Sequence, residues 1–348
     1  MKKKIFRIHN NLGSISKSII SSFALILLFY ATPIIINFAD QNILKEEYKN
    51  DSKKILAYTL NNKPQNNNET INEKDLLVDI LNLNEPEVDS VRLSASTIKQ
   101  LFEDTNYNLN DVRKNKIVKP VALSLLPNEI TKIENTKKRK ELFIQIVLPL
   151  ILEENNNIRA DRKKLFNIIN KNNNTELEKK WVEKKFKQYG VPSKDLSVLK
   201  IRIDEIPVSL AIAQAAKETG WGTSRFAQEG NALFGQWTWS GEGLTPKDSD
   251  KKDGHKVMKF NILQASVRAY QRNLNTHSSY QEFRRARAEL RDMNKKLDSL
   301  ILSEHLDKYA ETGEKYVDVI KKIIQQNSLK DFDDAKLLPA SYELKSLI

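Results

Sequence analysis

The residue whose type and position most clearly offer chemistry is Glu218, at the end of an apolar run. Residues 206–218 read IPVSLAIAQAAKE and are followed closely by Gly220. This pattern predicts a helix with Pro207 in its first turn and Gly220 just past its end. In a helix's last turn, desolvation and the negative end of the dipole both raise a carboxyl pKa. A carboxyl that stays protonated can act as a general acid, although an arbitrary Glu more often lies on a solvated helix end.

Composition excludes several other kinds of site. The 348 residues contain no Cys, which excludes disulfides, thiolate metal sites and cysteine nucleophiles. Four His occur without an H-E-x-x-H pair, and neither G-x-x-x-x-G-K-[ST] nor G-x-G-x-x-G is present. We therefore expect no metal, cofactor or nucleotide. The net charge of +12 suits an anionic partner, but no nucleic-acid-binding pattern accompanies it, so nucleic acid is not expected as that partner.

Mostly helical elements must position Glu218. The segment 232–239 and the segment 255–260 look extended and flank a charged loop at 241–254, which predicts a small two-stranded lobe. Apolar spacing over 135–170 predicts a long helix or a helix pair, with Pro149 as a kink. Further helices are expected at 95–103, 181–189, 206–218, 264–274, 280–290, 295–309 and 314–325.

The N-terminus has the pattern of a membrane anchor. Residues 1–17 carry five cations and no acid, and the apolar run 19–39 is about 20 residues long, enough to cross a bilayer. Asn37-Phe38-Ala39 is a poor cleavage site, which favours an uncleaved anchor over a removed signal peptide or a buried core helix. The positive-inside rule then predicts a single-pass protein of the inner (cytoplasmic) membrane, with everything after Asp40 in the periplasm or cell-wall space.

The sequence around Glu218 resembles a known family. Residues 215–227 read AAKETGWGTSRFA and residues 230–237 read GNALFGQW. They resemble the glucosaminidase family, glycoside hydrolase family 73, whose pattern is A-x-x-E-[ST]-G-W-G-x-S followed by N-L-F-G-x-W. The bacterial Bax-like branch is the most similar. Matching segments extend the resemblance over about 118–331, while Ala232 replaces the usual Asn or Asp and leaves the loop geometry open.

The resemblance implies an α+β, predominantly α fold. We expect a lysozyme-like helical domain with a small two-stranded β-lobe over the cleft, preceded by a helical region and the anchor. The expected parts are a basic cytoplasmic tail (1–17), a transmembrane signal anchor (18–39), a polar tether and poorly defined region (40–117), a helical accessory region (118–195), the glucosaminidase domain (196–331) and a C-terminal tail (332–348).

The resemblance also implies a peptidoglycan hydrolase that cuts the β-1,4 bond after N-acetylglucosamine. Glu218 matches the family's general acid, and Tyr309 matches a tyrosine near that acid. The second catalytic group is sought among Glu242, Asp248, Asp250 and Asp253 of the loop, with Asp248 and Asp250 preferred, or in the substrate's own acetamido group. The expected substrate-binding residues are Trp221, Ser224, Phe234, Gln236, Trp237 and Tyr270.

Other functions remain open on the sequence. The same fold can cut a different murein bond, as lysozymes, lytic transglycosylases or amidases do, or it can be a peptidoglycan-binding module without activity. Arg268, Arg272, Arg284 and Arg287 are candidates for binding peptide-stem carboxylates, although a solvated helix face is the favoured interpretation. His277 is interpreted as a hydrogen-bonded structural residue.

Overall fold

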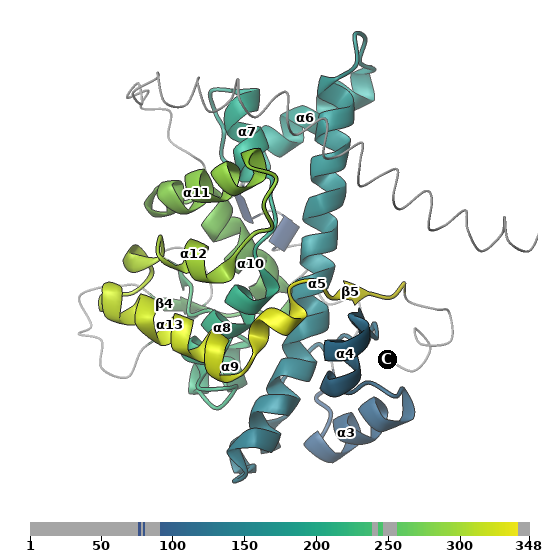
Figure 1. The fold of residues 1–348 in the computed structure, drawn as a ribbon, viewed down its shortest axis with the longest axis vertical. Coiled ribbons are helices and arrows are strands. Elements are labelled where there is room, and N and C mark those ends of the chain that lie inside the picture. Colours follow the sequence, from purple (N-terminus) through teal and green to yellow (C-terminus); the bar gives the residue numbers. More distant parts are fainter. Residues whose placement is uncertain (1–75, 78, 81–90, 239–242, 246–255, 340–348) are drawn as a thin grey trace, which may run out of the picture. The chain divides into compact units, whose positions relative to one another are not determined.

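A computed structural model describes residues 76, 77, 79, 80, 91–238, 243–245 and 256–339 (Figure 1). The chain divides into one compact unit of 1–64 with 291–295 and another of 65–290 with 296–348. Of the first unit only 291–295 are described, the end of a helix and the turn after it. The predicted tail and anchor and all four loop carboxylates lie outside the described residues. Within the ranges described, no helix is both long and apolar enough to span a bilayer.

Helices make up most of the described chain. They are α3 (Ala95–Asp104), α4 (Leu109–Asn115), α5 (Thr136–Ile169), α6 (Glu176–Gln188), α7 (Leu196–Arg202), α8 (Val208–Thr219), α9 (Arg225–Gly230), α10 (Leu263–Thr276), α11 (Gln281–Asp292), α12 (Ser299–Ser303) and α13 (Glu314–Gln326). Short 3-10 helices are η1 (Asn128–Lys132), η2 (Ser278–Tyr280), η3 (Asp307–Tyr309) and η4 (Leu329–Phe332). The helices predicted at 95–103, 181–189, 206–218, 264–274, 280–290 and 314–325 are confirmed, with shifted ends. The single helix predicted at 295–309 is wrong, because Asp298 caps the short α12 and the chain resumes only as η3.

α5 is one continuous helix of 34 residues (Figure 1). A proline inside a helix leaves the carbonyl four residues earlier without its backbone donor. For Pro149 that carbonyl belongs to Gln145, and it accepts a hydrogen bond from the Tyr107 hydroxyl at 3.1 Å. The side-chain Nε2 of Gln145 in turn donates to the backbone carbonyl of Tyr107 at 2.9 Å. Tyr107 is 2% exposed, so this exchange takes place inside the core and lets the helix run through Pro149.

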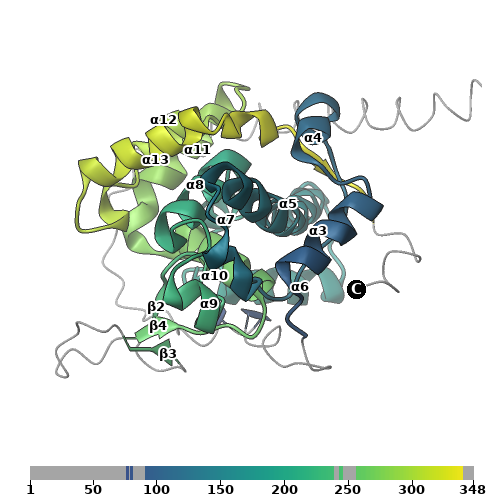
Figure 2. The same cartoon turned by 90° about the horizontal axis from the view of Figure 1, so that it is seen from below.

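The helix that carries Glu218, α8, lies at the centre of the helical body. α5, α12, α13 and η4 all contact it (Figure 2). Its alanines allow these close approaches, and all of its residues before Lys217 are buried. At its N-terminus, the Asp333 carboxylate accepts hydrogen bonds from the Ser209 backbone N–H and hydroxyl, both at 2.8 Å. At its C-terminus, Gly220 adopts a left-handed conformation with φ of 56°, which ends the helix directly after the acid.

A three-stranded antiparallel sheet forms the β-lobe, in the order β2-β4-β3. The strands are β2 (Trp237–Thr238), β3 (Gly243–Leu244) and β4 (Lys256–Met258), with Trp237 opposite Val257 and Gly243 opposite Met258. The prediction of a two-stranded lobe is therefore wrong, because the lobe has a third strand. The extra strand β3 lies inside the predicted loop, where the Leu244 side chain packs closely over Gly230, at the end of α9. A second sheet pairs β1 (Ile117–Val118) in parallel with β5 (Lys336–Leu337).

Candidate active site

Glu218 lies in the last turn of α8, as predicted, with its side chain half-buried. Burial raises the pKa of its carboxyl, although a hydrogen bond with Tyr316 and the charge of Lys217 act in the opposite direction. A turn of the 231–237 segment approaches the carboxyl closely. A Cβ added to Gly235, which has a φ of +59°, would lie 3.4 Å from Glu218 Oε2. Partial burial thus raises the pKa of the carboxyl, which suits a proton donor.

A relay of buried polar side chains supports the acid. The Tyr270 hydroxyl donates to Gln214 Oε1 at 2.6 Å, and Gln214 Nε2 donates to the Tyr316 hydroxyl oxygen at 3.1 Å. Tyr316 then hydrogen-bonds the Glu218 carboxyl. Burial and the charge of Glu218 raise the pKa of Tyr316, so its hydroxyl stays protonated and donates to the carboxyl. The relay fixes the carboxyl's position and stabilises its charged form.

Tyr309 acts on the turn beside the acid. Its hydroxyl donates to the Phe234 carbonyl at 3.0 Å, one residue before Gly235. Its ring stacks on that of Tyr316, with centroids 5.3 Å apart and an interplanar angle of 15°. Tyr280 lies next to it, at 6.0 Å between centroids, and burial raises the pKa of Tyr280 to about 12. Tyr309 therefore joins the turn to the tyrosines that surround the acid.

Four other predicted site residues belong to the same turn or pack on it. Phe234 stacks on Tyr270 with centroids 3.8 Å apart and is 2% exposed. The backbone carbonyl of Gln236 accepts a hydrogen bond from the Met258 N–H at 2.7 Å. The side-chain Oε1 of Gln236 is buried without a hydrogen-bond partner among the residues described. The backbone of Trp237 pairs with Val257. The structure thus brings Glu218, Phe234, Tyr270 and Tyr309 together, with Gln236 next to Gly235.

Two predicted substrate-binding residues make their contacts elsewhere. Trp221 packs edge-on against Phe143 at 5.9 Å, and Lys140 Nζ lies 4.8 Å from its ring centroid, so both partners are on α5. The Ser224 hydroxyl accepts from the Ala227 N–H at 3.2 Å and caps α9. Their roles in substrate binding stay predictions. The preferred acids Asp248 and Asp250 lie outside the described residues.

The sequence reasoning assigned no role to Tyr316, Tyr280 or Gln214. Gln214 had a signal that was not used, because it precedes Glu218 by one helical turn and shares its face. His277 is confirmed as a hydrogen-bonded residue, since its Nδ1 accepts from the Ser279 N–H at 3.2 Å. Across the ranges that the structure covers, no group of three or more His, Asp or Glu side chains is arranged to hold a metal ion.

The favoured interpretation of the arginines as a solvated face is wrong. Arg268 forms an ion pair with Glu154 at 2.7 Å, and Arg272, Arg284 and Arg287 are buried. Arg284 donates to the carbonyls of Leu274 and His277, and Arg287 donates to those of Ile201, Asp204 and Glu205. Their guanidinium groups thereby satisfy carbonyls at helix ends and in the turn before α8, where helical partners are missing.

A polar cavity of about 360 Å³ lies among the charged residues on another face of α10. Arg268, Arg272, Glu154 and Asp79 contribute to its lining, which does not include Glu218 or the tyrosines around it. The spacing of Arg268 and Arg272 puts them on one face of α10, and Tyr270 on the opposite face. This cavity is therefore separate from the candidate active site.

Comparisons with known proteins identify a family that part of the chain matches. The profile of the Glucosaminidase family, described as "Mannosyl-glycoprotein endo-beta-N-acetylglucosaminidase", matches residues 199–329. The chain is also similar to "Protein bax" of Escherichia coli (strain K12), with 30% identity over 210 residues that cover 59% of this chain and 75% of that protein. No solved structure matches significantly.

Proposed function

The chain belongs to the glucosaminidase family of peptidoglycan hydrolases, and from this premise we propose that it is an endo-β-N-acetylglucosaminidase with Glu218 as its general acid. The proposed reaction is hydrolysis of the β-1,4 bond after N-acetylglucosamine in the glycan strand. The observation that carries the proposal is the desolvated Glu218 carboxyl, whose pKa is raised by burial within the tyrosine cluster. A protonated carboxyl at this position supports donation of a proton to the leaving glycosidic oxygen.

The tyrosine relay supports the same role. Once Glu218 has given up its proton it becomes a carboxylate, and the Tyr316 hydroxyl donates to that charge. A hydrogen bond to an ionised acceptor is stronger than one to a neutral acceptor, so the contact strengthens as the proton leaves. Interactions that strengthen on the way to the transition state accelerate the reaction. Tyr309 positions the Gly235 turn beside the acid through the Phe234 carbonyl.

We propose that the second catalytic group comes from the segment 241–254, with Asp248 and Asp250 ahead of Glu242 and Asp253. An oxocarbenium-like transition state needs a nucleophile or an activated water on the face opposite the acid. Removal of the right carboxylate should lower kcat far more than it raises KM. If each of the four single Ala variants keeps more than about a third of kcat, substrate assistance or a water held by Tyr309 replaces this proposal.

Substrate contacts are proposed along the turn and the first strand of the lobe. The buried Oε1 of Gln236 is an acceptor without a described partner, which suits a sugar hydroxyl or amide N–H. Trp237 follows it, and an aromatic ring there would stack on a sugar face. Gln236→Ala should therefore raise KM for murein fragments, and an unchanged KM would remove Gln236 from the site.

We propose that residues 18–39 anchor the protein in the inner membrane, with residues 1–17 in the cytoplasm and everything after Asp40 outside it. The support is the length of the apolar run and the basic residues before it. Protease added to spheroplasts should digest the 196–331 region. Protection of that region, or recovery of a soluble form that begins near Asp40, would contradict the anchor.

The test of the proposed acid is Glu218→Gln, assayed on purified murein. Gln keeps the shape of the side chain but has no proton to donate, so we expect a loss of at least about 100-fold in kcat. Glu229→Gln is the matched control, because Glu229 is an exposed glutamate on neighbouring α9, and it should keep wild-type activity. A Glu218→Gln variant that keeps about a tenth of the activity would show that the acid is misassigned. A folded wild type that binds murein without cutting it would instead favour a binding module.

A further inference from the structure

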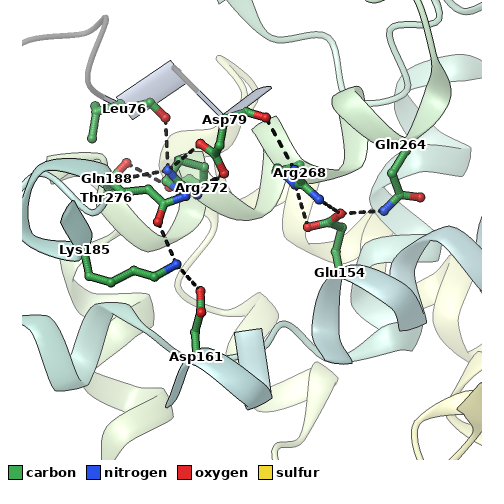
Figure 3. Close-up of polar contacts among 10 residues, drawn as sticks. All are labelled: Leu76, Asp79, Glu154, Asp161, Lys185, Gln188, Gln264, Arg268, Arg272 and Thr276. Carbon is green, nitrogen blue, oxygen red and sulfur yellow. Dashed lines mark hydrogen bonds and ion pairs between the residues drawn. The ribbon is translucent and has the colours of Figure 1, made fainter. Parts of the chain in front are cut away.

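A short segment near residue 79 is held against α10 by charged and polar contacts (Figure 3). The Asp79 carboxylate accepts from Arg272 Nη2 at 2.9 Å and from Gln188 Nε2 at 2.6 Å. Arg272 also donates to the Leu76 carbonyl at 3.1 Å, and Arg268 donates to the Asp79 carbonyl at 3.4 Å. Arg272 is only 7% exposed and the Asp79 side chain is 24% exposed, so these are partly buried, charge-assisted bonds. The body of the protein therefore binds both the main chain and the acid of this segment.

The apolar residues of the segment pack in a cluster that includes a residue of the β-lobe. Ile80 is fully buried and shares an apolar cluster with Val257 and Phe260, and Leu77 packs against the same cluster. Met258, the last residue of β4, also contacts this cluster. The segment thus contacts the charged face of α10 and shares an apolar cluster with the central strand of the lobe.

β4 connects this contact to the acid. Val257 pairs with Trp237, and the Met258 N–H donates to the Gln236 carbonyl at 2.7 Å. Gln236 is directly preceded by Gly235, and a Cβ added to Gly235 would lie 3.4 Å from Glu218 Oε2. A short route of packing and backbone hydrogen bonds therefore runs from Ile80 through β4 to the turn beside the acid.

We propose that Asp79 and Ile80 are positioning residues for the reaction: they fix β4, and through it the Gly235 turn, against Glu218. The inference rests on the proposed function for its activity readout. Because misplacement of a reacting group by about 1 Å can cost roughly 100-fold in rate, a loosened β4 lowers kcat without removing any group that touches the substrate.

The experiment compares Asp79→Ala and Ile80→Ala with a matched control in the full-length chain. Asp161→Ala is the control, because Asp161 lies in the same charged cluster and is paired with Lys185. Its side chain is 28% exposed against 24% for Asp79. Its ion pair joins α5 to α6 and is hydrogen-bonded to the segment only through Gln188, so its removal leaves the direct contacts of Asp79 in place. Each variant is assayed for kcat and KM on murein and for amide hydrogen exchange at residues 256–258.

We expect kcat to fall about ten-fold in both positioning variants while KM changes less than about two-fold, with faster exchange at 256–258. Asp161→Ala should keep the wild-type kcat and exchange. Wild-type kcat and exchange in folded Asp79→Ala and Ile80→Ala would overturn the proposal, as would an equal loss in the control. If Asp79→Ala does not fold, Asp79→Asn is used with the same criteria. If the wild type does not cut murein, the exchange rates still decide the positioning claim, so the two failures are distinguishable.

Discussion

Replacing Tyr316 by Phe removes one hydroxyl from the relay that ends on Glu218. The hydroxyl donates to the Glu218 carboxyl and lowers the pKa of that carboxyl against the larger, opposite effect of burial. Without it, the charged form of Glu218 loses a stabilising partner while the desolvation remains. The sign is therefore fixed: the pKa of Glu218 rises further, and the acid keeps its proton to higher pH.

The size of the effect follows from the strength of such a bond. A hydrogen bond to a charged group contributes about 1.5–3 kcal/mol net, and a ten-fold change in an equilibrium corresponds to about 1.4 kcal/mol. Glu218 is only half-buried, so the lower end applies. We expect the alkaline limb of the kcat/KM profile to move up by about one pH unit, because that limb reports loss of the acid's proton. The variant also leaves Gln214 Nε2 without its acceptor, which costs about 1–3 kcal/mol of stability.

The assay is the pH dependence of kcat/KM on murein fragments, measured as new reducing ends. Tyr309→Phe is the matched control, because Tyr309 is the neighbouring stacked tyrosine but its hydroxyl donates to the Phe234 carbonyl instead of the acid. The alkaline limb of the Tyr309→Phe profile should lie at the same pH as in the wild type. A limb that does not move in Tyr316→Phe, that moves to lower pH, or that moves equally in both variants would show that the Tyr316 hydroxyl does not set the pKa of Glu218.

Two further predictions concern backbone and cap. Gly235→Ala places a side chain on a left-handed residue beside Glu218, so it should lower both Tm and kcat. Gly190→Ala is the control, because Gly190 has a similar φ of 60° but follows α6, and it should lower Tm alone. Equal kcat values in the two variants would contradict this prediction. Thr175→Ala removes the capping box of α6 and should cost about 1 kcal/mol in denaturant unfolding with normal murein cleavage, and an unchanged midpoint would show that the cap contributes nothing.

The acid and its helix could be predicted because the information is local. The apolar run of α8, Pro207 and Gly220 fix the helix, and the position of Glu218 in its last turn predicts burial and a raised pKa, as found. Helices with strong apolar periodicity, such as α10 and α13, were predicted for the same reason. A period of 3.6 residues depends only on neighbours in the sequence.

What the sequence could not supply depends on contacts between distant segments. The hydroxyl that satisfies Gln145 and keeps α5 continuous comes from Tyr107, 38 residues earlier. Nothing in local spacing indicates that Tyr316, among ten tyrosines, bonds Glu218, or that Arg287 is buried on loop carbonyls. The third strand was missed because Gly243 and Leu244 form only two residues of strand, too short for an alternating pattern.

In the proposed reaction, Glu218 donates a proton to the oxygen of the glycosidic bond after N-acetylglucosamine. Mass spectrometry of purified murein digested with the full-length chain identifies which sugar carries the new reducing end. We predict reducing N-acetylglucosamine in the wild-type digest and no new ends with Glu218→Gln. New reducing N-acetylmuramic acid, a 1,6-anhydro product, or freed stem peptides on uncut glycan would contradict the account.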